Sequence, residues 1–390
     1  MILNGRTIRS LVFIPMCIIV INITGCSAAP LSVAPSPWLV FWQNYTTHFI
    51  SPQGRVIDYE EGDITTSEAQ SYALFFALVA NDKTLFSRLL AWTQNNLARG
   101  SLAEHLPAWR WGKAKNGQWG VLDKNSASDA DLWLAYTLIQ AGRLWHEPRY
   151  TALGTLLAKR IALREVVTVP GFGAVLLPGK EGFHNKQDIY ILNVSYLPLP
   201  VLDALSKELP DGPWQQIAMN LPTLMKDVAP KGFAPDWVSY TVGKGFGAAP
   251  EGTAGSYNAI RVYLWAGMTN PASPGSSGIL GALWGMRDYL STHLLPPLTV
   301  DVATGRVSGV GPVGFSAAVI PYLERLGMKT QATNQMLRLT ADLDQKTGLY
   351  GTPPRYYDQN LILFSIGWKD GIFRFAPDGN LVPIWQQANN

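Results

Sequence analysis

The sequence has little charge and almost no cysteine. Only 15% of the 390 residues are Asp, Glu, Lys or Arg, and 31 basic against 28 acidic side chains leave a formal net charge of +3. The 47% hydrophobic content excludes a disordered chain and is enough to bury a large core in one or two domains. Because the charges nearly balance, composition gives no sign of a polyanion-binding surface, and we expect no nucleic-acid partner.

Several common functional motifs are also missing. The sequence has no glycine-rich phosphate loop, no Cys/His spacing of a zinc site and no nucleophile elbow. These absences argue against a nucleotide-binding protein, a structural-zinc protein and a serine hydrolase. Aromatic residues are abundant instead, with 14 Trp, 15 Tyr and 14 Phe. They suit either a heavily packed helical core or a groove that stacks on sugar rings, and composition does not choose between the two.

The amino terminus has the pattern of a signal peptide. Arg6 and Arg9 form a positive segment, and the apolar run at residues 11–23 is too short to span a membrane comfortably. The run ends in Thr24-Gly25-Cys26, which resembles the bacterial lipobox, in which the Cys is lipidated. We therefore predict a lipoprotein-type signal peptide at residues 1–25 and a lipid on Cys26. The alternative is an ordinary signal peptide cleaved near Ala28-Ala29.

The predicted lipoprotein signal peptide implies where the protein resides and which cysteine it keeps. Cys17 would be removed with the signal peptide, which leaves Cys26 as the only thiol and allows no intrachain disulfide. Ser27 after the Cys resembles lipoproteins sent to the outer membrane. Residues 26–37 are small and proline-bearing, which suits a tether. We expect an exported protein on the periplasmic side, lipid-anchored to the outer membrane through Cys26.

Helical periodicity dominates after the tether. Two strand-like runs, 166–177 and 372–384, contain turn residues and predict hairpins, and no parallel-sheet pattern appears. The predicted helices are 38–49, 67–80, 83–98, 128–142, 148–163, 196–207, 213–228, 256–268, 277–292, 315–326, 330–345 and 357–369.

About a dozen helices with unequal loops restrict the architecture. An open solenoid should show a repeat of about 34–47 residues, and the sequence shows none. A closed (α/α)6 toroid tolerates unequal loops on one rim, where function then resides. We predict an all-α fold for residues 38–390, an (α/α)6 toroid of about twelve helices with minor β-hairpins. A bundle or a two-domain helical protein is the alternative.

Three polar motifs stand at the starts of predicted helices. Glu68 precedes an aromatic stripe that could desolvate it, as suits a general acid, but Thr65-x-x-Glu68 is also a capping box. The motif at 128–131 places Asp129 and Asp131 at a helix start and is likewise cap-like, as is the motif at 256–261.

Taken together, these motifs favour chemistry over capping. In a helical toroid such starts converge on one rim, and glycoside hydrolysis needs two carboxylates across a groove: one protonates the leaving oxygen and the other activates water. Aromatic side chains that could line the groove are Trp109, Trp111, Tyr196 and Trp237.

The motifs resemble glycoside hydrolase family 8. The run 127–131, with apolar residues at the family's spacing up to Trp145, resembles the family signature, and 67–73 resembles the segment that holds its general acid. Trp109-Arg110-Trp111, 256–261 and 356–360 also have counterparts there. The likeness spans residues 38–370 and is strongest to the endoglucanases that accompany bacterial cellulose synthase. It implies an inverting (α/α)6 enzyme acting on β-1,4-linked glucans without a metal or cofactor.

The resemblance assigns roles to individual residues. Glu68 falls on the general acid, Asp129 on the acid that orients the sugar, and Arg261 on a subsite position. The aromatic residues implied as subsite residues, besides the four named above, are Tyr257 and Tyr356.

One position departs from the cellulase pattern. Asn258 stands where the cellulase branch has the Asp that acts as base, and an amide cannot accept a proton from water. The branch with xylanases and chitosanases has Asn there and takes its base from a Glu in the preceding loop. Glu251 is the only carboxylate between residues 241 and 255 and is the corresponding candidate.

Three functional hypotheses follow. The first is an exported inverting glycoside hydrolase that cleaves internal β-1,4 bonds of a glucan, with an association with the cellulose synthesis machinery implied by the resemblance. The second is a lipid-anchored glucan-binding protein that has lost its base at Asn258. The third is an enzyme acting on chitosan or xylan.

Overall fold

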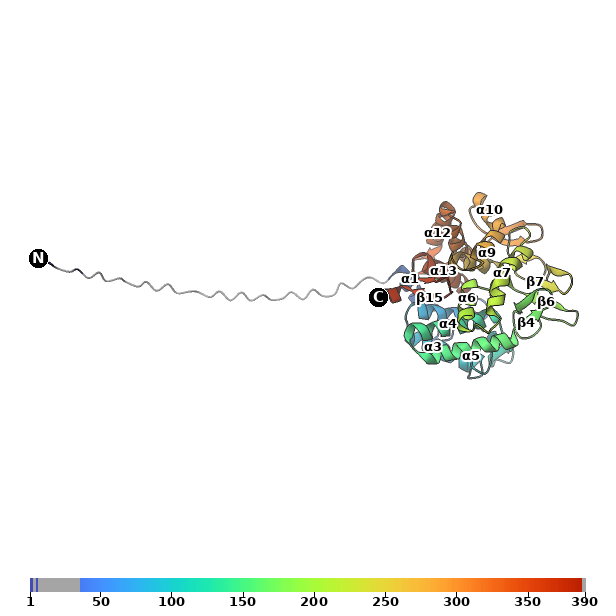
Figure 1. The fold of residues 1–390 in the computed structure, drawn as a ribbon, viewed down its shortest axis with the longest axis horizontal. Helices are drawn as coiled ribbons and strands as arrows, with labels where there is room; N and C mark the ends of the chain where they lie inside the picture. Colours follow the sequence, from blue (N-terminus) through green and yellow to red (C-terminus); the bar gives the residue numbers. More distant parts are fainter. Residues whose placement is uncertain (3–4, 6–35, 388–390) are drawn as a thin grey trace. The chain divides into compact units, whose positions relative to one another are not determined.

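Helices form the framework of the fold (Figure 1). The computed structural model describes residues 1–2, 5 and 36–387, so most of the predicted signal peptide, Cys26 and most of the predicted tether lie outside the described residues. The residues from Ser36 onward group as one unit. The helices of the described residues are α1 (Pro37–Phe49), α2 (Ser67–Val79), α3 (Lys83–Leu97), α4 (Ser128–Trp145), α5 (Pro148–Arg164), α6 (Leu199–Glu208), α7 (Trp214–Val228), α8 (Ala259–Met268), α9 (Ser276–Ala282), α10 (Trp284–Thr292), α11 (Val313–Arg325), α12 (Lys329–Asp342), α13 (Tyr356–Lys369) and α14 (Ile384–Gln387).

Six of these helices form a closed inner ring. Helices α2, α4, α6, α8, α11 and α13 contact one another in that order, and α13 returns to α2. Each inner helix also packs against an outer one, in the pairs α2–α3, α4–α5, α6–α7, α8–α9, α11–α12 and α13–α1. Six helix pairs closed in this way are an (α/α)6 toroid, and the predicted fold class is confirmed.

The inner and outer helices differ in how much of their surface is buried. In α2 every residue except Glu68 is buried, whereas α7 buries only one stripe. A helix that is apolar all round must be enclosed, and a helix with one apolar stripe covers the enclosed layer. Trp133 packs against Phe75, Trp265 and Phe364 with ring centroids 5.0–5.3 Å apart. Part of the aromatic content therefore builds the core.

Short strands occupy the long connections. They pair into six small sheets, namely β1–β2–β3, β4–β5, β6–β7–β8, β9–β10–β11, β12–β13 and β14–β15. Their bounds are β1 (Thr65–Thr66), β2 (Arg110–Lys113), β3 (Trp119–Asp123), β4 (Val166–Val169), β5 (Gly173–Leu176), β6 (Ile189–Leu192), β7 (Val238–Thr241), β8 (Gly245–Ala248), β9 (Ala254–Gly255), β10 (Pro297–Asp301), β11 (Arg306–Val310), β12 (Leu343–Asp344), β13 (Leu349–Tyr350), β14 (Phe373–Phe375) and β15 (Leu381–Pro383).

The two predicted hairpins, β4–β5 and β14–β15, are confirmed. The other sheets were not predicted, because their strands are two to five residues long and several contain glycine, so they show no apolar alternation. The predicted helix 277–292 is two helices, since the backbone at Leu283 leaves the helical region with φ −93° and ψ 23°. The helix predicted from residue 196 begins at Leu199, after a 3₁₀ turn at Val194–Tyr196.

The lengths of the connections define a functional rim. Short links such as 80–82 and 146–147 follow the inner helices, so each outer helix runs antiparallel to its partner. Long segments precede the inner helices and carry β1 to β13. These segments and the starts of the inner helices therefore share one rim of the toroid.

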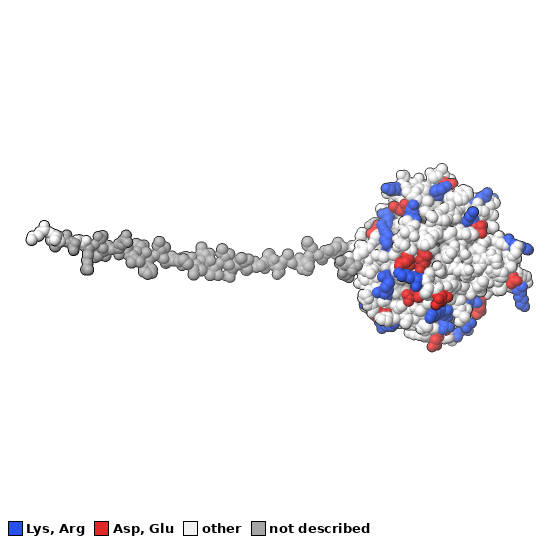
Figure 2. Space-filling view, viewed as in Figure 1, with Lys and Arg blue, Asp and Glu red and all other residues white. Residues whose placement is uncertain are grey.

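The surface matches the low charge of the sequence. On the face shown in Figure 2, basic and acidic side chains are mixed and separated by wide uncharged areas. In the described part of the chain, no helix is long and apolar enough to cross a membrane.

Candidate active site

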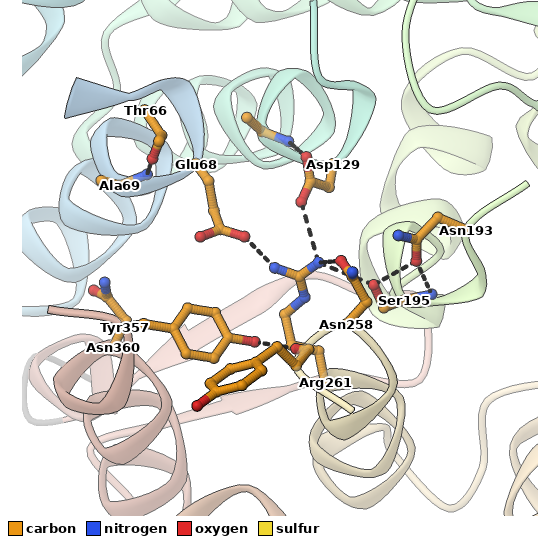
Figure 3. A network of polar contacts seen from close by, with 12 residues as sticks. Thr66, Glu68, Ala69, Asp129, Asn193, Ser195, Asn258, Arg261, Tyr357 and Asn360 are labelled. Carbon is orange, nitrogen blue, oxygen red and sulfur yellow. Dashed lines mark hydrogen bonds and ion pairs between the residues drawn. The ribbon is translucent and has the colours of Figure 1, made fainter. Parts of the chain in front are cut away.

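Four inner helices begin beside one another on this rim and place their first-turn side chains in contact (Figure 3). Arg261 lies at the centre of these contacts. Its guanidinium donates to Glu68 Oε2, to Ser195 Oγ at 3.0 Å and to Asn258 Oδ1 at 2.8 Å. Asp129 Oδ2 lies 3.7 Å from the same group. Arg261 on α8 thus joins the starts of α2, α4 and α8 with the 3₁₀ turn before α6.

Burial differs among the charged side chains. The side chains of Arg261 and Asp129 are 4% and 5% exposed, and that of Glu68 is 16% exposed. A buried cation between two carboxylates is held by charge-assisted hydrogen bonds, and removing one partner leaves the others uncompensated. Glu68 is the carboxylate of this cluster that solvent or a substrate reaches most easily.

Glu68 does not cap its own helix. The N-cap of α2 is Thr66, whose Oγ1 accepts from the Ala69 N–H at 3.1 Å. The capping-box interpretation was wrong because Thr65 belongs to β1 and uses its hydroxyl on the Val56 carbonyl at 2.6 Å. Glu68 is free to point across the rim, where its Oε1 accepts from the Tyr356 hydroxyl of α13 at 3.2 Å.

Asp129 is held in the first turn of α4. The cap-like interpretation of 128–131 was also wrong, because the N-cap is Ala127 and no side chain caps this helix. Asp129 Oδ1 accepts from the Ala130 N–H at 2.8 Å. Burial raises the pKa of Asp129 to about 7, with Arg261 opposing and Glu68 adding to the shift.

A second buried acidic pair lies behind Asp129. Ser126 Oγ donates to Glu165 Oε1 at 2.5 Å, and Asp131 is fully buried nearby. Burial first, and then the neighbouring Glu165, raise the pKa of Asp131 well above its usual value, and burial raises the pKa of Glu165 to about 8. Sequence reasoning missed Glu165, because it lies at the end of α5, far from Asp131 in the chain.

This pair predicts how stability depends on pH. The pKa of Glu165 is higher in the folded than in the unfolded state, so its contribution to stability is complete below about pH 4 and is lost as pH rises through about 8. Glu165→Gln keeps the shape of the side chain but removes its charge. Raising the pH from 5 to 9 should therefore lower the free energy of unfolding less in this variant than in the wild type, by on the order of 1–3 kcal/mol. Urea unfolding followed by circular dichroism at both pH values measures this. The control is Glu208→Gln, an exposed position, and an unchanged pH dependence in Glu165→Gln would contradict the prediction.

Asn258 begins α8, and the cap of this helix comes from a distant residue. Asp236 Oδ1 accepts from the backbone N–H groups of Ser256, Asn258 and Ala259 at 2.7–2.9 Å. The local cap interpretation of 256–261 missed this, since Asp236 lies some twenty residues earlier and only its neighbour Trp237 was selected. The capped start presents the Asn258 amide to Arg261.

Glu251 lies apart from these contacts. It is exposed in the turn 249–252 after β8. Among the described residues it forms no hydrogen bond or ion pair with the Arg261 cluster. Its role as general base therefore stays a prediction.

The predicted aromatic residues lie in three groups on the rim. The ring of Trp237 stacks on that of Phe183 with 6.2 Å between the ring centroids, and its centroid lies 6.3 Å from that of Tyr196. Tyr257, 43% exposed, lies 5.9 Å from Tyr357.

The third aromatic group is built on the β2–β3 hairpin. Trp111 stacks on Trp119 at 5.3 Å, and Arg55 lies over both rings. The Trp109 carbonyl accepts from the Ser67 N–H at 3.0 Å, which joins this hairpin to the start of α2. Sequence reasoning selected Trp109 and Trp111 and missed Arg55 and Trp119. Within the described residues, no group of three or more His, Cys, Asp or Glu side chains is arranged to hold a metal ion.

Comparisons with known proteins identify relatives of this chain. The model of the family "Glycosyl hydrolases family 8" matches residues 16–371. The endoglucanase of Escherichia coli (strain K12) is 46% identical over 348 residues, which cover 89% of this chain and 91% of that protein. The crystal structure of endo-1,4-D-glucanase from Vibrio fischeri ES114 superposes with a TM-score of 0.84 at 41% identity, covering 89% and 99% of the two chains. The endo-beta-1,4-glucanase CMCax from Acetobacter xylinum superposes with a TM-score of 0.70 at 26% identity, covering 86% and 99%.

Proposed function

Because the chain belongs to glycosyl hydrolases family 8 and is a glycosidase, we propose that it is an endoglucanase that cleaves internal β-1,4 bonds of a glucan by inversion. The observation that carries this proposal is the position of Glu68. It is the most exposed carboxylate of a cluster made by four inner helices, and it lies among three groups of aromatic side chains. Aromatic faces bind sugar rings by stacking, which would bring a glycosidic oxygen to Glu68.

In this reaction Glu68 donates the proton to the leaving oxygen. Asp129, fixed by its own helix start and facing Arg261, orients the sugar that becomes the new reducing end. Inversion requires a base about 6.5–9.5 Å from the acid, with a water between them. Asn258 occupies the base position of the cellulase branch and cannot take the proton. We therefore infer slow turnover, unless Glu251 moves into the site when substrate binds.

Release of reducing ends tests the proposal. The purified protein should cut carboxymethylcellulose and cellohexaose in preference to chitosan and xylan. Proton NMR of the first products should show the α-anomer, because inversion at a β-linkage forms it. Preferential cleavage of chitosan or xylan, or a first-formed β-anomer, would contradict the substrate or the stereochemistry respectively.

The second candidate function is glucan binding with no turnover. Asn258 favours it, because loss of a general base typically costs about 10²–10⁴ in rate, and the exposed position of Glu251 adds support. Binding of cellohexaose with no release of reducing ends over days would establish this candidate in place of the first.

We also propose that the protein is exported, anchored through a lipid on Cys26 and active beside the cellulose synthesis machinery. The lipobox-like residues 23–26 and the resemblance of the motifs to endoglucanases that accompany cellulose synthase support this. Recovery of the protein in the cytoplasmic fraction of its cells would overturn the proposal.

A further inference from the structure

A basic pocket lies on the same rim, between the ends of the outer helices α3 and α5. It has a volume of about 660 Å³ and is lined by the ends of α3 and α5, by Val121 of β3, and by the loop residues at 104–108, 124 and 180–181. Outer helices end where inner helices begin, so these helix ends share the rim with Glu68 and Asp129. The basic residues in its lining are Arg99, Lys124, Arg160, Arg164 and Lys180.

The residues that line this pocket carry more positive than negative charge, and the carboxylate of Asp123 lies close enough to interact with Lys180. Two carboxylates, Glu104 and Glu181, also line it, so five cations against two anions leave +3, the formal net charge of the whole chain. In residues 36–387 none of the five cations forms an ion pair. The near-neutral composition conceals this concentration of charge, and sequence analysis consequently missed it.

Backbone contacts hold two of the cations in place without neutralising them. Arg160 donates to the Ala103 carbonyl at 2.5 and 3.1 Å, and Lys180 Nζ donates to the Lys124 carbonyl at 2.5 Å. Like charges held together in a concave site are costly unless an anion occupies it. Cations at helix ends do stabilise the helix dipole, but Lys124 and Lys180 lie in loops. The arginine fork suits carboxylate and phosphate groups, which it binds through paired hydrogen bonds.

The pocket is physically connected to the catalytic cluster. Asn125 Nδ2 donates to the Glu181 carbonyl at 2.9 Å, and Ser126 Oγ accepts from the Lys180 N–H at 3.1 Å. The segment that carries Lys124 continues directly into α4, and five residues separate Lys124 from Asp129. Their Cα atoms are therefore at most about 18 Å apart. A polymer that binds at Asp129 and extends toward Lys124 would reach the pocket.

We propose that this pocket binds an anionic substituent, a carboxylate or phosphate, carried by the polysaccharide that occupies the rim. The proposal rests on the proposed function for the identity of the polymer. It extends that function by making an acid-substituted glucan, rather than the plain polymer, the preferred ligand.

Paired binding measurements test this proposal. Isothermal titration calorimetry with carboxymethylcellulose and neutral hydroxyethylcellulose, in a Glu68→Gln background that prevents cutting, gives the ratio of the two affinities. Carboxymethylcellulose should bind more tightly, with a preference that shrinks between 50 and 300 mM salt. In the triple variant Arg99→Gln/Lys124→Gln/Arg164→Gln the ratio should fall about tenfold, since each exposed charge contact contributes modestly and three are removed together.

The matched control removes the same charge elsewhere. Lys226→Gln/Lys329→Gln/Lys346→Gln changes three exposed lysines outside the pocket and should leave the ratio at its original value. An equal fall in both triple variants, or equal affinity for the two polymers, would overturn the pocket proposal. The proposal would also be overturned if the protein bound phosphatidylglycerol vesicles more tightly than carboxymethylcellulose and the pocket triple variant lost that vesicle binding. Hydrolysis of uncharged cellohexaose by the wild type reports on the proposed function separately, so the two proposals fail distinguishably.

Discussion

Glu68→Gln is expected to lower the hydrolysis of cellohexaose by at least about 10²–10⁴, because the amide retains the shape of the side chain but has no acidic proton to donate. The loss should appear in kcat, with cellohexaose still bound, since the aromatic groups on the rim are untouched. Initial rates of reducing-end release and calorimetric binding of cellohexaose measure the two parts.

Two controls show whether a loss of activity in Glu68→Gln is specific to catalysis. Glu68 also binds Arg261 and Tyr356, so the variant needs a test of folding, and circular dichroism should give an unchanged spectrum. Glu208→Gln, an exposed glutamate at the end of α6, is the matched control and should retain full activity. Wild-type rates in Glu68→Gln would remove the general-acid assignment, whatever the base proves to be.

The sequence predicted those parts of the site that are local. Glu68, Asp129 and Arg261 were selected because each stands at a helix start after a loop, and residues near in the chain determine such starts. The inner helices were equally readable, because a run such as 72–79 has no charged residue and only the Tyr72 hydroxyl as a polar side-chain group. Boundaries failed where a turn replaced the first residues of a predicted helix, before Leu199, and where the backbone left the helical region inside a predicted helix, at Leu283.

The parts that could not be predicted depend on closure of the ring. Arg261 meets Glu68 only because α8 and α2 belong to one ring, 193 residues apart in the chain. The cap from Asp236 and the buried pair of Asp131 with Glu165 likewise join residues whose local patterns show no sign of one another. Each of the three starts looked like a simple cap because the true partners came from distant parts of the chain.

Asn258→Asp is expected to raise kcat on cellohexaose by about 10²–10⁴, the usual effect of a general base. The new carboxylate would stand at the first turn of α8, where the helix dipole and the Arg261 guanidinium, 2.8 Å from the present amide oxygen, favour its ionised form. It would face the same cluster as Glu68, so a water between them could be activated. Initial rates for the wild type, Asn258→Asp and Asn258→Gln measure the gain, and Asn258→Gln should show none.

Glu251→Gln distinguishes this prediction from the alternative in which Glu251 is the general base. If the exposed loop supplied the base, Glu251→Gln would cost about 10²–10⁴ in kcat and Asn258→Asp would add little. That pattern would contradict the expected gain and place the proton acceptor in a loop that must move to reach the water. If Asn258 limits turnover, Glu251→Gln should be nearly silent, and the double variant Glu251→Gln/Asn258→Asp should be as fast as Asn258→Asp alone. The double variant decides, because only a base at position 258 makes it independent of residue 251.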